Sequence, residues 1–104
     1  MSHAIVWEFL VPEAQRVAFE AAYGPDGPWA LLFRQAPGFL EVKLLRSQES
    51  AERYLTIDRW ESNTAFENFK SQFALEYQAL DRQLEGLASS ELRVGAFDDL
   101  PSAG

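Results

Sequence analysis

Four segments of the chain alternate between two sets of strand-forming side chains, and the gaps between them limit what the chain can fold into. The segments cover residues 3–11, 39–46, 53–61 and 91–97. A short polar turn separates the second segment from the third, which predicts an antiparallel hairpin. The two longer gaps have room for helices, so the chain is expected to form one sheet with helices packed against it.

Helical spacing of apolar side chains fills both longer gaps. Helices are predicted over residues 13–23, 28–36 and 63–87, and Pro12 and Pro28 stand where the first two begin. One apolar stripe continues along the third helix and comprises Phe66, Phe69, Phe73, Tyr77, Leu80, Leu84 and Leu87. The order of the elements predicts an α+β, ferredoxin-like fold: a four-stranded antiparallel sheet with the helices on one face.

Length and charge restrict the class of protein. The 104 residues fit a single domain, expected over residues 1–97, with a flexible C-terminal tail over residues 98–104. The net charge is −7, which disfavours nucleic acid as a partner. No apolar run is long enough to span a membrane, and Met1-Ser2-His3 lacks the basic region of a signal peptide. Because the chain has no cysteine, we expect a reducing compartment and a cytoplasmic location.

Two features predict a homodimer. A helix over residues 63–87 would be about 37 Å long, whereas a nine-residue strand reaches about 30 Å, so an apolar helix end would overhang the sheet. Helices on one face also leave the other face uncovered, with apolar side chains of the first strand on it whichever face it is. A two-fold dimer that pairs the sheets would cover both surfaces. The alternative is a strongly curved sheet wrapped by the long helix.

Most common catalytic motifs are missing from the sequence. There is no glycine-rich phosphate loop, no Ser-His-Asp triad and no acidic spacing typical of a calcium loop. His3 is the only histidine, and we expect it at the surface near the start of the first strand. We therefore predict no metal and no cofactor.

The third strand carries the most informative polar residues. Tyr54, Thr56, Asp58 and Trp60 alternate along one side of it. If that side lies under the helices, it combines an apolar wall with hydrogen-bonding groups, as a small-molecule pocket does. A desolvated Asp58 would have a raised pKa and could act as a base near neutral pH, with Tyr54 as a second candidate catalytic residue. In the alternative, Asp58 pairs with a neighbouring arginine at a solvated edge and Trp60 is a core residue.

The strand pattern itself favours that alternative. The rows Leu40/Val42/Leu44, Leu55/Ile57 and Leu92/Val94 are more apolar than the rows with which they alternate. Packing these rows under the helices would turn Asp58 and Trp60 away from a helix-covered pocket.

Several short motifs resemble the antibiotic biosynthesis monooxygenase (ABM) family of dimeric α/β barrels. They are the strand-ending Trp60-Glu61-Ser62 followed by Ala65-Phe66 and Phe69, the first strand from Ile5 to Pro12, and Ala36-Pro37-Gly38-Phe39 before the second strand. The resemblance implies a homodimer whose two sheets close a barrel with the helices outside. It also implies oxidation of polycyclic aromatic substrates by molecular oxygen, without metal or flavin, through a substrate carbanion that the pocket stabilises. In that pattern Trp60 borders the pocket and Thr56 lies on the same side.

The sequence departs from this family at three positions. Thr56 replaces an amide, Phe66 replaces a pocket tyrosine, and Lys70 stands where related haem-degrading enzymes have a helix histidine. The last difference argues against haem degradation.

Two functions follow. The first is a cofactor-independent monooxygenase for a small aromatic or quinol-like molecule, with polar contacts from Tyr54, Thr56 and Asp58. The expected pocket walls are Trp29, Phe33, Trp60, Phe66 and Phe73. The second is a non-catalytic dimeric module that binds a small apolar ligand or a protein partner.

Overall fold

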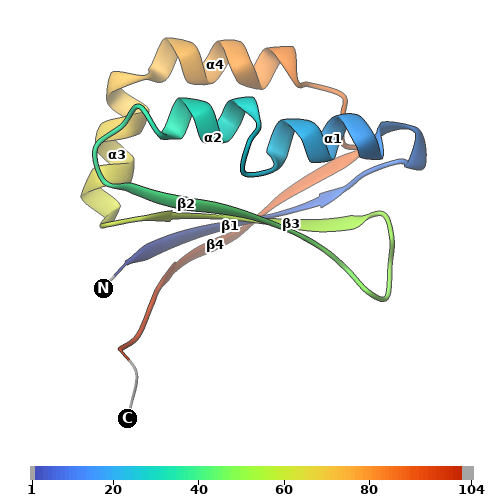
Figure 1. Ribbon diagram of the computed structural model, residues 1–104, viewed down its shortest axis with the longest axis horizontal. Coiled ribbons are helices and arrows are strands. Elements are labelled where there is room, and N and C mark those ends of the chain that lie inside the picture. The colour runs from blue at the N-terminus through green and yellow to red at the C-terminus, as the bar shows by residue number, and fades with distance from the viewer. Residues whose placement is uncertain (1, 102–104) are drawn as a thin grey trace.

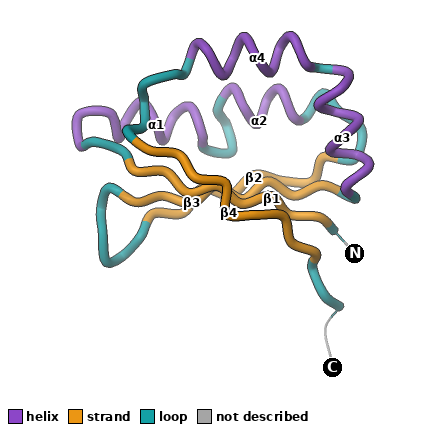
Figure 2. Tube along the Cα trace, turned by 180° about the vertical axis from the view of Figure 1, so that it is seen from behind, coloured by secondary structure: helices purple, strands orange, loops and turns teal. Residues whose placement is uncertain are grey.

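The computed structural model describes residues 2–101, and in this range one antiparallel sheet packs against a layer of helices (Figure 1). In chain order the elements are β1 (His3–Leu10), η1 (Glu13–Gln15), α1 (Arg16–Tyr23), α2 (Pro28–Phe33), β2 (Phe39–Arg46), β3 (Arg53–Trp60), α3 (Asn63–Gln72), α4 (Ala74–Gln83) and β4 (Ser90–Asp98). The strands lie in the order β2-β3-β1-β4. Figure 2 shows from behind that the helices share one side of the sheet. The α+β, ferredoxin-like fold is confirmed.

Strand register decides which side chains face the helices. β1 and β3 are antiparallel neighbours, with Ile5 opposite Asp58 and Trp7 opposite Thr56. β2 lies on the other side of β3 and places Val42 opposite Asp58. Residues directly opposite each other share a sheet face. The row of Asp58 and Thr56 therefore lies under the helices, together with the odd-numbered residues of β1.

The expectation that the most apolar rows lie under the helices is wrong for two strands. Leu55 of β3 and Leu92 of β4 both pair with Glu8 of β1, on the sheet face away from the helices, which we call the open face. In β2, by contrast, Val42 and Leu44 do face the helices, since they pair with Asp58 and Thr56. Apolarity could not distinguish the two faces because both are rich in apolar side chains.

The expected single helix over residues 63–87 is also wrong, because it is interrupted at Phe73. Phe73 has φ −113° and ψ 27°, ends α3 and precedes α4. Figure 1 shows α3 beside one end of the sheet and α4 running back above α2. The change of direction keeps the apolar stripe on a single core cluster, from Phe66 of α3 to Leu84 just beyond α4. The predicted overhanging helix end is therefore absent from residues 2–101.

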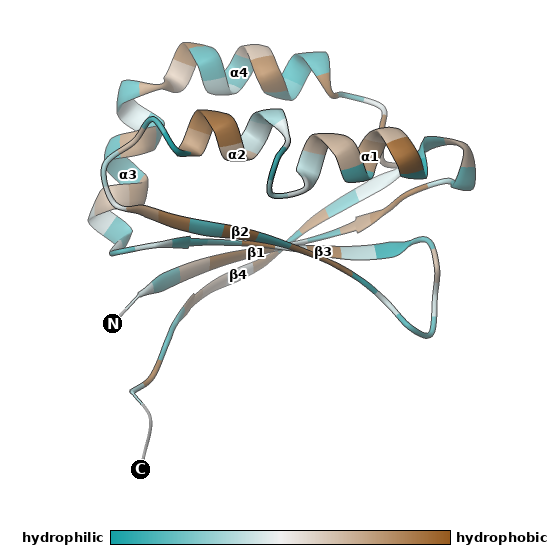
Figure 3. Cartoon of the chain, in the orientation of Figure 1, coloured by the Kyte–Doolittle hydropathy of each residue, from teal (hydrophilic) through white to brown (hydrophobic). Residues whose placement is uncertain are grey.

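Aromatic rings dominate the interior. A larger cluster is built on the buried Ile5, Trp29, Leu32, Phe33, Ala36, Trp60 and Phe69. A smaller one contains the buried Phe9, Val11, Phe19 and Tyr54. Figure 3 shows that α4 alternates between hydrophilic and hydrophobic residues, whereas α2 carries a hydrophobic stretch. Four of the six residues of α2 are buried, and none of α4 is. α4 therefore covers the core with only part of its surface.

The start of α3 is fixed by two local features. The hydroxyl of Ser62 accepts a hydrogen bond from the backbone N–H of Ala65 at 3.1 Å, so Ser62 is the N-cap of α3. Gly38, just before β2, has φ +88°, and a Cβ added there would lie 2.6 Å from the Cβ of Ala65. A glycine is needed at this position because both the backbone angle and the close approach exclude a side chain. The close approach of Gly38 to Ala65 places the first turn of α3 beside the start of β2.

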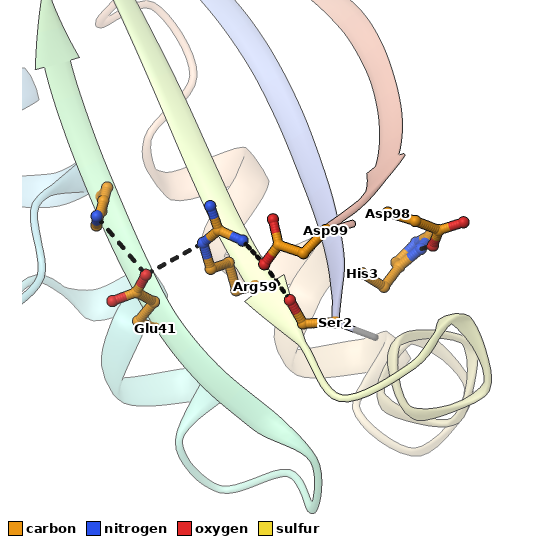
Figure 4. Close-up of polar contacts among 7 residues, drawn as sticks. Ser2, His3, Glu41, Arg59, Asp98 and Asp99 are labelled. Atoms are coloured by element: carbon orange, nitrogen blue, oxygen red, sulfur yellow. Dashed lines mark hydrogen bonds and ion pairs between the residues drawn. The ribbon is translucent and has the colours of Figure 1, made fainter. Parts of the chain in front are cut away.

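Polar and charged contacts connect Ser2 and Asp99 to Arg59 of β3, and through Arg59 to β2 (Figure 4). Asp99 accepts hydrogen bonds from Ser2 and Arg59. Nε of Arg59 also lies 3.2 Å from Oε1 of Glu41. β4 continues to Asp98, so the first residues of the expected tail are bound to the sheet. Residues 102–104 of that tail lie outside the described range.

No helix within residues 2–101 is both long and apolar enough to cross a membrane.

Candidate functional site

A pocket lies between the sheet and the helices, on the side where the row of Asp58 and Thr56 points. Its volume is about 170 Å³. An apolar cavity of ~150 Å³ is large enough to hold benzene, so this pocket can take at least a one-ring molecule. The lining residues are Ile5, Trp7, Phe9, Tyr23, Trp29, Phe33, Val42, Thr56, Asp58, Phe66, Tyr77, Asp81 and Glu91.

Asp58 is the buried charged group in the pocket wall. Only 8% of its surface is exposed, and its Oδ2 accepts a hydrogen bond from Trp60 Nε1 at 2.7 Å. Burial raises the pKa of Asp58 from 3.8 to about 6, and the Trp60 hydrogen bond and the nearby His3 oppose that rise. At neutral pH about nine-tenths of this carboxyl group is therefore ionised, and it remains basic enough to take a proton.

Five of the eight residues selected from the sequence line the pocket. Thr56 and Asp58 of β3 form its polar floor, and Trp29, Phe33 and Phe66 form apolar walls from the helices. Their contacts agree with the sequence prediction, while their roles in binding or catalysis stay predictions.

Trp60 lies behind the pocket wall. It is fully buried, and its ring packs edge-on against Phe33, Phe39 and Phe66 with centroids 5.3–5.6 Å apart. It affects the site through its hydrogen bond to Asp58. Trp60 therefore fits the interpretation as a core residue; it is not among the residues that line the pocket, and its predicted role in substrate binding stays a prediction.

Besides Trp60, two more of the predicted site residues do not line the pocket. Tyr54 is almost completely buried in the smaller core cluster, and its hydroxyl donates a hydrogen bond to Glu20. Because this hydroxyl is directed to the α1 surface, the geometry does not fit the predicted catalytic contact. Phe73 packs on Phe69 at the break between α3 and α4, with ring centroids 5.6 Å apart.

The only histidine is more buried than the sequence indicated. The side chain of His3 is 11% exposed, and its Nδ1 lies 3.8 Å from Oδ1 of Asp98. Its ring centroid is 6.5 Å from that of Phe66, a pocket residue. The expectation of a surface histidine is therefore corrected, since β1 turns His3 toward α3.

Sequence reasoning missed the tyrosines and acids that close the pocket. Tyr23 ends α1, Tyr77 and Asp81 lie one turn apart on α4, and Glu91 lies on β4. Burial raises the pKa of Tyr23 to about 12, and burial also raises the pKa of Tyr77. Burial, Asp81 and other acids raise the pKa of Glu91. The four residues come from α1, α4 and β4, so only the fold reveals the group.

Within residues 2–101, no three His, Cys, Asp or Glu side chains come together in a way that could hold a metal ion.

Comparison with known proteins identifies one family. The family model described as "Antibiotic biosynthesis monooxygenase" matches residues 3–79, which include β1 through most of α4. A search of curated proteins finds no match.

Solved structures share the fold over nearly the whole chain. A mutant of SnoaB, a cofactor-independent oxygenase from Streptomyces nogalater, superposes with a TM-score of 0.79 and 24% identity, covering 98% of this chain and 96% of its own. A putative antibiotic biosynthesis monooxygenase from Bordetella bronchiseptica superposes with a TM-score of 0.74 and 20% identity, covering 96% of this chain and 98% of its own. A mutant of MhuD, with two manganese protoporphyrin IX bound per active site, superposes with a TM-score of 0.74 and 24% identity, covering 98% of both chains. At these identities the similarity establishes the fold.

Proposed function

The chain belongs to the antibiotic biosynthesis monooxygenase family, and from this membership we propose that it is a cofactor-independent monooxygenase acting on a small aromatic or quinol-like molecule. The description of SnoaB as a cofactor-independent oxygenase supports the reaction type. The observation that carries the proposal is the position of Asp58. It is a buried carboxylate with a raised pKa, in the wall of a pocket otherwise formed largely by aromatic rings.

Asp58 is the proposed base. A phenol or quinol bound between Thr56 and the aromatic walls would present its hydroxyl to the polar floor of the pocket. Transfer of the hydroxyl proton to Asp58 leaves an electron-rich anion whose charge is shared with the ring carbons. Such a proton transfer contributes ~10²–10⁴-fold to rate when donor and acceptor are well placed.

Molecular oxygen is the second substrate and the oxidant. The activated ring carbon forms a C–O bond with one oxygen atom, and the distal oxygen takes a proton to give a hydroperoxide. Loss of water from this hydroperoxide removes the remaining hydrogen of the same carbon and breaks the O–O bond. A CH₂ group of the keto tautomer thus becomes C=O while the second oxygen leaves as water. The carbon loses four electrons and oxygen gains four, so no external reductant is required.

The residues around Asp58 support this chemistry in different ways. Trp60 donates to one carboxylate oxygen and holds the group in place at the pocket wall. Thr56 offers a hydroxyl on the same strand face, two residues away. Trp29, Phe33 and Phe66 exclude water, which keeps the pKa of Asp58 raised and favours a flat apolar ligand.

The pocket does not fit a haem iron. No histidine lines it, and the amino group of Lys70 lies over the ring of Phe66, 5.3 Å from its centroid. We therefore do not propose that this chain binds a porphyrin as MhuD does.

We propose that two copies associate through the open face of the sheet. Leu92 is 58% exposed there, and Leu45, which lies opposite Leu55, is 46% exposed. Burying these side chains against a second sheet would remove apolar surface from water. Leu92→Glu should shift the molecular mass in light scattering from two chains to one. Leu31 on α2, which is 54% exposed, provides the control, because Leu31→Glu lies on the helix side and should leave the dimer intact.

The single-domain organisation over residues 1–97 and a cytoplasmic location belong to the same proposal. The lack of cysteine supports a reducing compartment.

Isotope labelling tests the reaction. Purified protein is incubated under ¹⁸O₂ with a panel of naphthols and naphthoquinols, in metal-chelated buffer without added flavin. A monooxygenase should place one ¹⁸O atom in each product molecule and consume one O₂ per product. Asp58→Asn should lower the rate by about 10²–10⁴-fold, whereas Asp26→Asn, at an exposed turn, should not change it.

Two outcomes would reject the proposal. One is product formation that is equally fast without protein or with the Asp58 variant. The other is saturable ligand binding with no oxygen uptake across the panel, which would favour the non-catalytic ligand-binding module instead.

A further inference from the structure

The indole of Trp29 carries an unsatisfied hydrogen-bond donor at the pocket. Trp29 is 8% exposed, and its Nε1 is buried with no hydrogen-bond partner among the residues that the structure describes. Leaving a buried N–H unpaired destabilises a fold, so such groups are usually satisfied by protein, water or ligand. Trp29 lines the same pocket as Asp58, so the missing acceptor is expected on the pocket side of the indole, in the ligand-bound protein.

Tyr23 lies between this indole and the smaller core cluster. Its ring stacks on Phe19 with centroids 4.3 Å apart and tilts against Phe9 at 5.0 Å, so packing on two sides fixes its position. Its ring centroid is 6.2 Å from that of Trp29, and both residues line the pocket. The Trp29 indole is close enough to lower the pKa of Tyr23 against the larger effect of burial. The two polar groups therefore form one local unit.

Burial, and to a smaller degree the neighbouring acids, keep the Tyr23 phenol a donor. Glu91, Asp81 and Tyr77 all raise the pKa of Tyr23 beyond the effect of burial, to about 12. The phenol is therefore protonated throughout the physiological range, and its O–H can donate whenever an acceptor is present. Asp81 and Glu91 raise the pKa of Tyr23 through their own negative charges.

The donor unit and the base lie on different layers of the molecule. Tyr23 and Trp29 come from α1 and α2, whereas Thr56 and Asp58 come from the sheet. A ligand in the pocket thus meets an ionised acceptor from the sheet and neutral donors from the helices.

We propose that Tyr23, with the Trp29 indole behind it, is a specificity-determining donor that binds an acceptor oxygen of the substrate. In the complex, the Trp29 N–H, which is unpaired in the free protein, donates to the Tyr23 oxygen, and Tyr23 donates its own proton to the ligand. The pocket then selects aromatic molecules with a hydroxyl at one end and a carbonyl-type oxygen at the other. This inference rests on the proposed function only in taking the same pocket as the substrate site.

A matched pair of ligands tests the inference without turnover. 4-Hydroxyacetophenone carries a phenol and a carbonyl, and 4-ethylphenol has a similar shape without the acceptor. Isothermal titration calorimetry under anaerobic conditions gives both dissociation constants. One neutral hydrogen bond should favour 4-hydroxyacetophenone by about three- to tenfold in the wild-type protein. Tyr23→Phe should abolish this preference, and Trp29→Phe should reduce it.

Tyr54→Phe is the control, because it removes a phenol hydroxyl that lies outside the pocket. The preference should persist in this variant. A purely structural role of Tyr23 would weaken both ligands equally and leave their ratio unchanged, and that result would overturn the inference. Equal affinities in the wild-type protein would overturn it as well.

Failure of this inference and failure of the proposed function are distinguishable. A wild-type preference that disappears in Tyr23→Phe, together with no ¹⁸O incorporation from any substrate, supports the donor and rejects the monooxygenase. Incorporation of ¹⁸O together with equal affinities for the two phenols supports the monooxygenase and rejects the donor. Binding of neither phenol would reject the donor, whatever the labelling result.

Discussion

The raised pKa of Asp58 makes folding stability depend on pH, and Asp58→Asn isolates this dependence. Burial shifts the pKa from 3.8 to about 6, which corresponds to about 3 kcal/mol at 1.36 kcal/mol per pKa unit. The sign follows from the direction of the shift. Below 3.8 the carboxyl group is protonated in both states. Between 3.8 and 6 the unfolded chain loses the proton first, so the folded state becomes progressively less stable, and above 6 the full loss persists.

Asparagine removes the ionisation and keeps an oxygen that can accept from Trp60. The free energy of unfolding of Asp58→Asn, minus that of the wild type, should therefore increase with pH. From the two pKa values the increase between pH 5 and pH 8 is about 1.4 kcal/mol. Any change in packing caused by the amide is independent of pH and cancels in this comparison. At pH 8 the variant should be the more stable protein by about 2–3 kcal/mol.

Urea denaturation at a series of pH values, with equal protein concentrations, measures this difference. Asp26→Asn at an exposed turn is the matched control and should give a flat difference between pH 5 and pH 8. If Asp58→Asn also gives a flat difference, the carboxyl group is not desolvated in the folded protein. That result would refute the reasoning and would remove the main support for Asp58 as a base.

Three further predictions concern neighbouring features. Trp60→Phe removes the hydrogen bond that lowers the pKa of Asp58, so the acidic limb of a pH–rate profile should move to higher pH; an unchanged limb would show that the bond is not formed. Gly38→Ala should cost more stability in urea than Gly86→Ala, because both have positive φ but only Gly38 has a contact at 2.6 Å; equal losses would contradict the steric argument. Tyr54→Phe should lower stability by about 1 kcal/mol in the same assay and leave oxygen uptake unchanged, whereas lost uptake would return Tyr54 to the site.

Local patterns were sufficient to predict the fold. Turn residues and two-residue alternation located the strands, because these signals depend on neighbours in the sequence. The break at Phe73 was not predictable in the same way. No proline or glycine marks it, and the stripe of apolar side chains continues through it without a gap. The break follows from packing, since Phe66 and Leu84 can reach one core cluster only when the chain changes direction between them.

The site was predictable where it lies on one strand and unpredictable where several elements meet. Thr56 and Asp58 were identified together because alternation places them on one side of β3. Tyr23, Asp81 and Glu91 come from three different elements, and nothing in the local sequence of any of them indicates a pocket. The choice between the two sheet faces also required the third dimension, as both faces carry apolar rows.

The aromatic pocket walls have two effects that oppose each other. Rings such as Phe33 and Phe66 stabilise the fold by packing on Trp60, and they also exclude the water that would stabilise the charge on Asp58. Removing a wall ring, as in Phe66→Ala, would lose packing energy but hydrate the carboxylate and lower its pKa toward the ordinary value. The protein would recover part of the lost stability at neutral pH while its base became weaker. The base strength of Asp58 therefore depends on maintaining a folded state that is less stable than it would be with a neutral residue at this position.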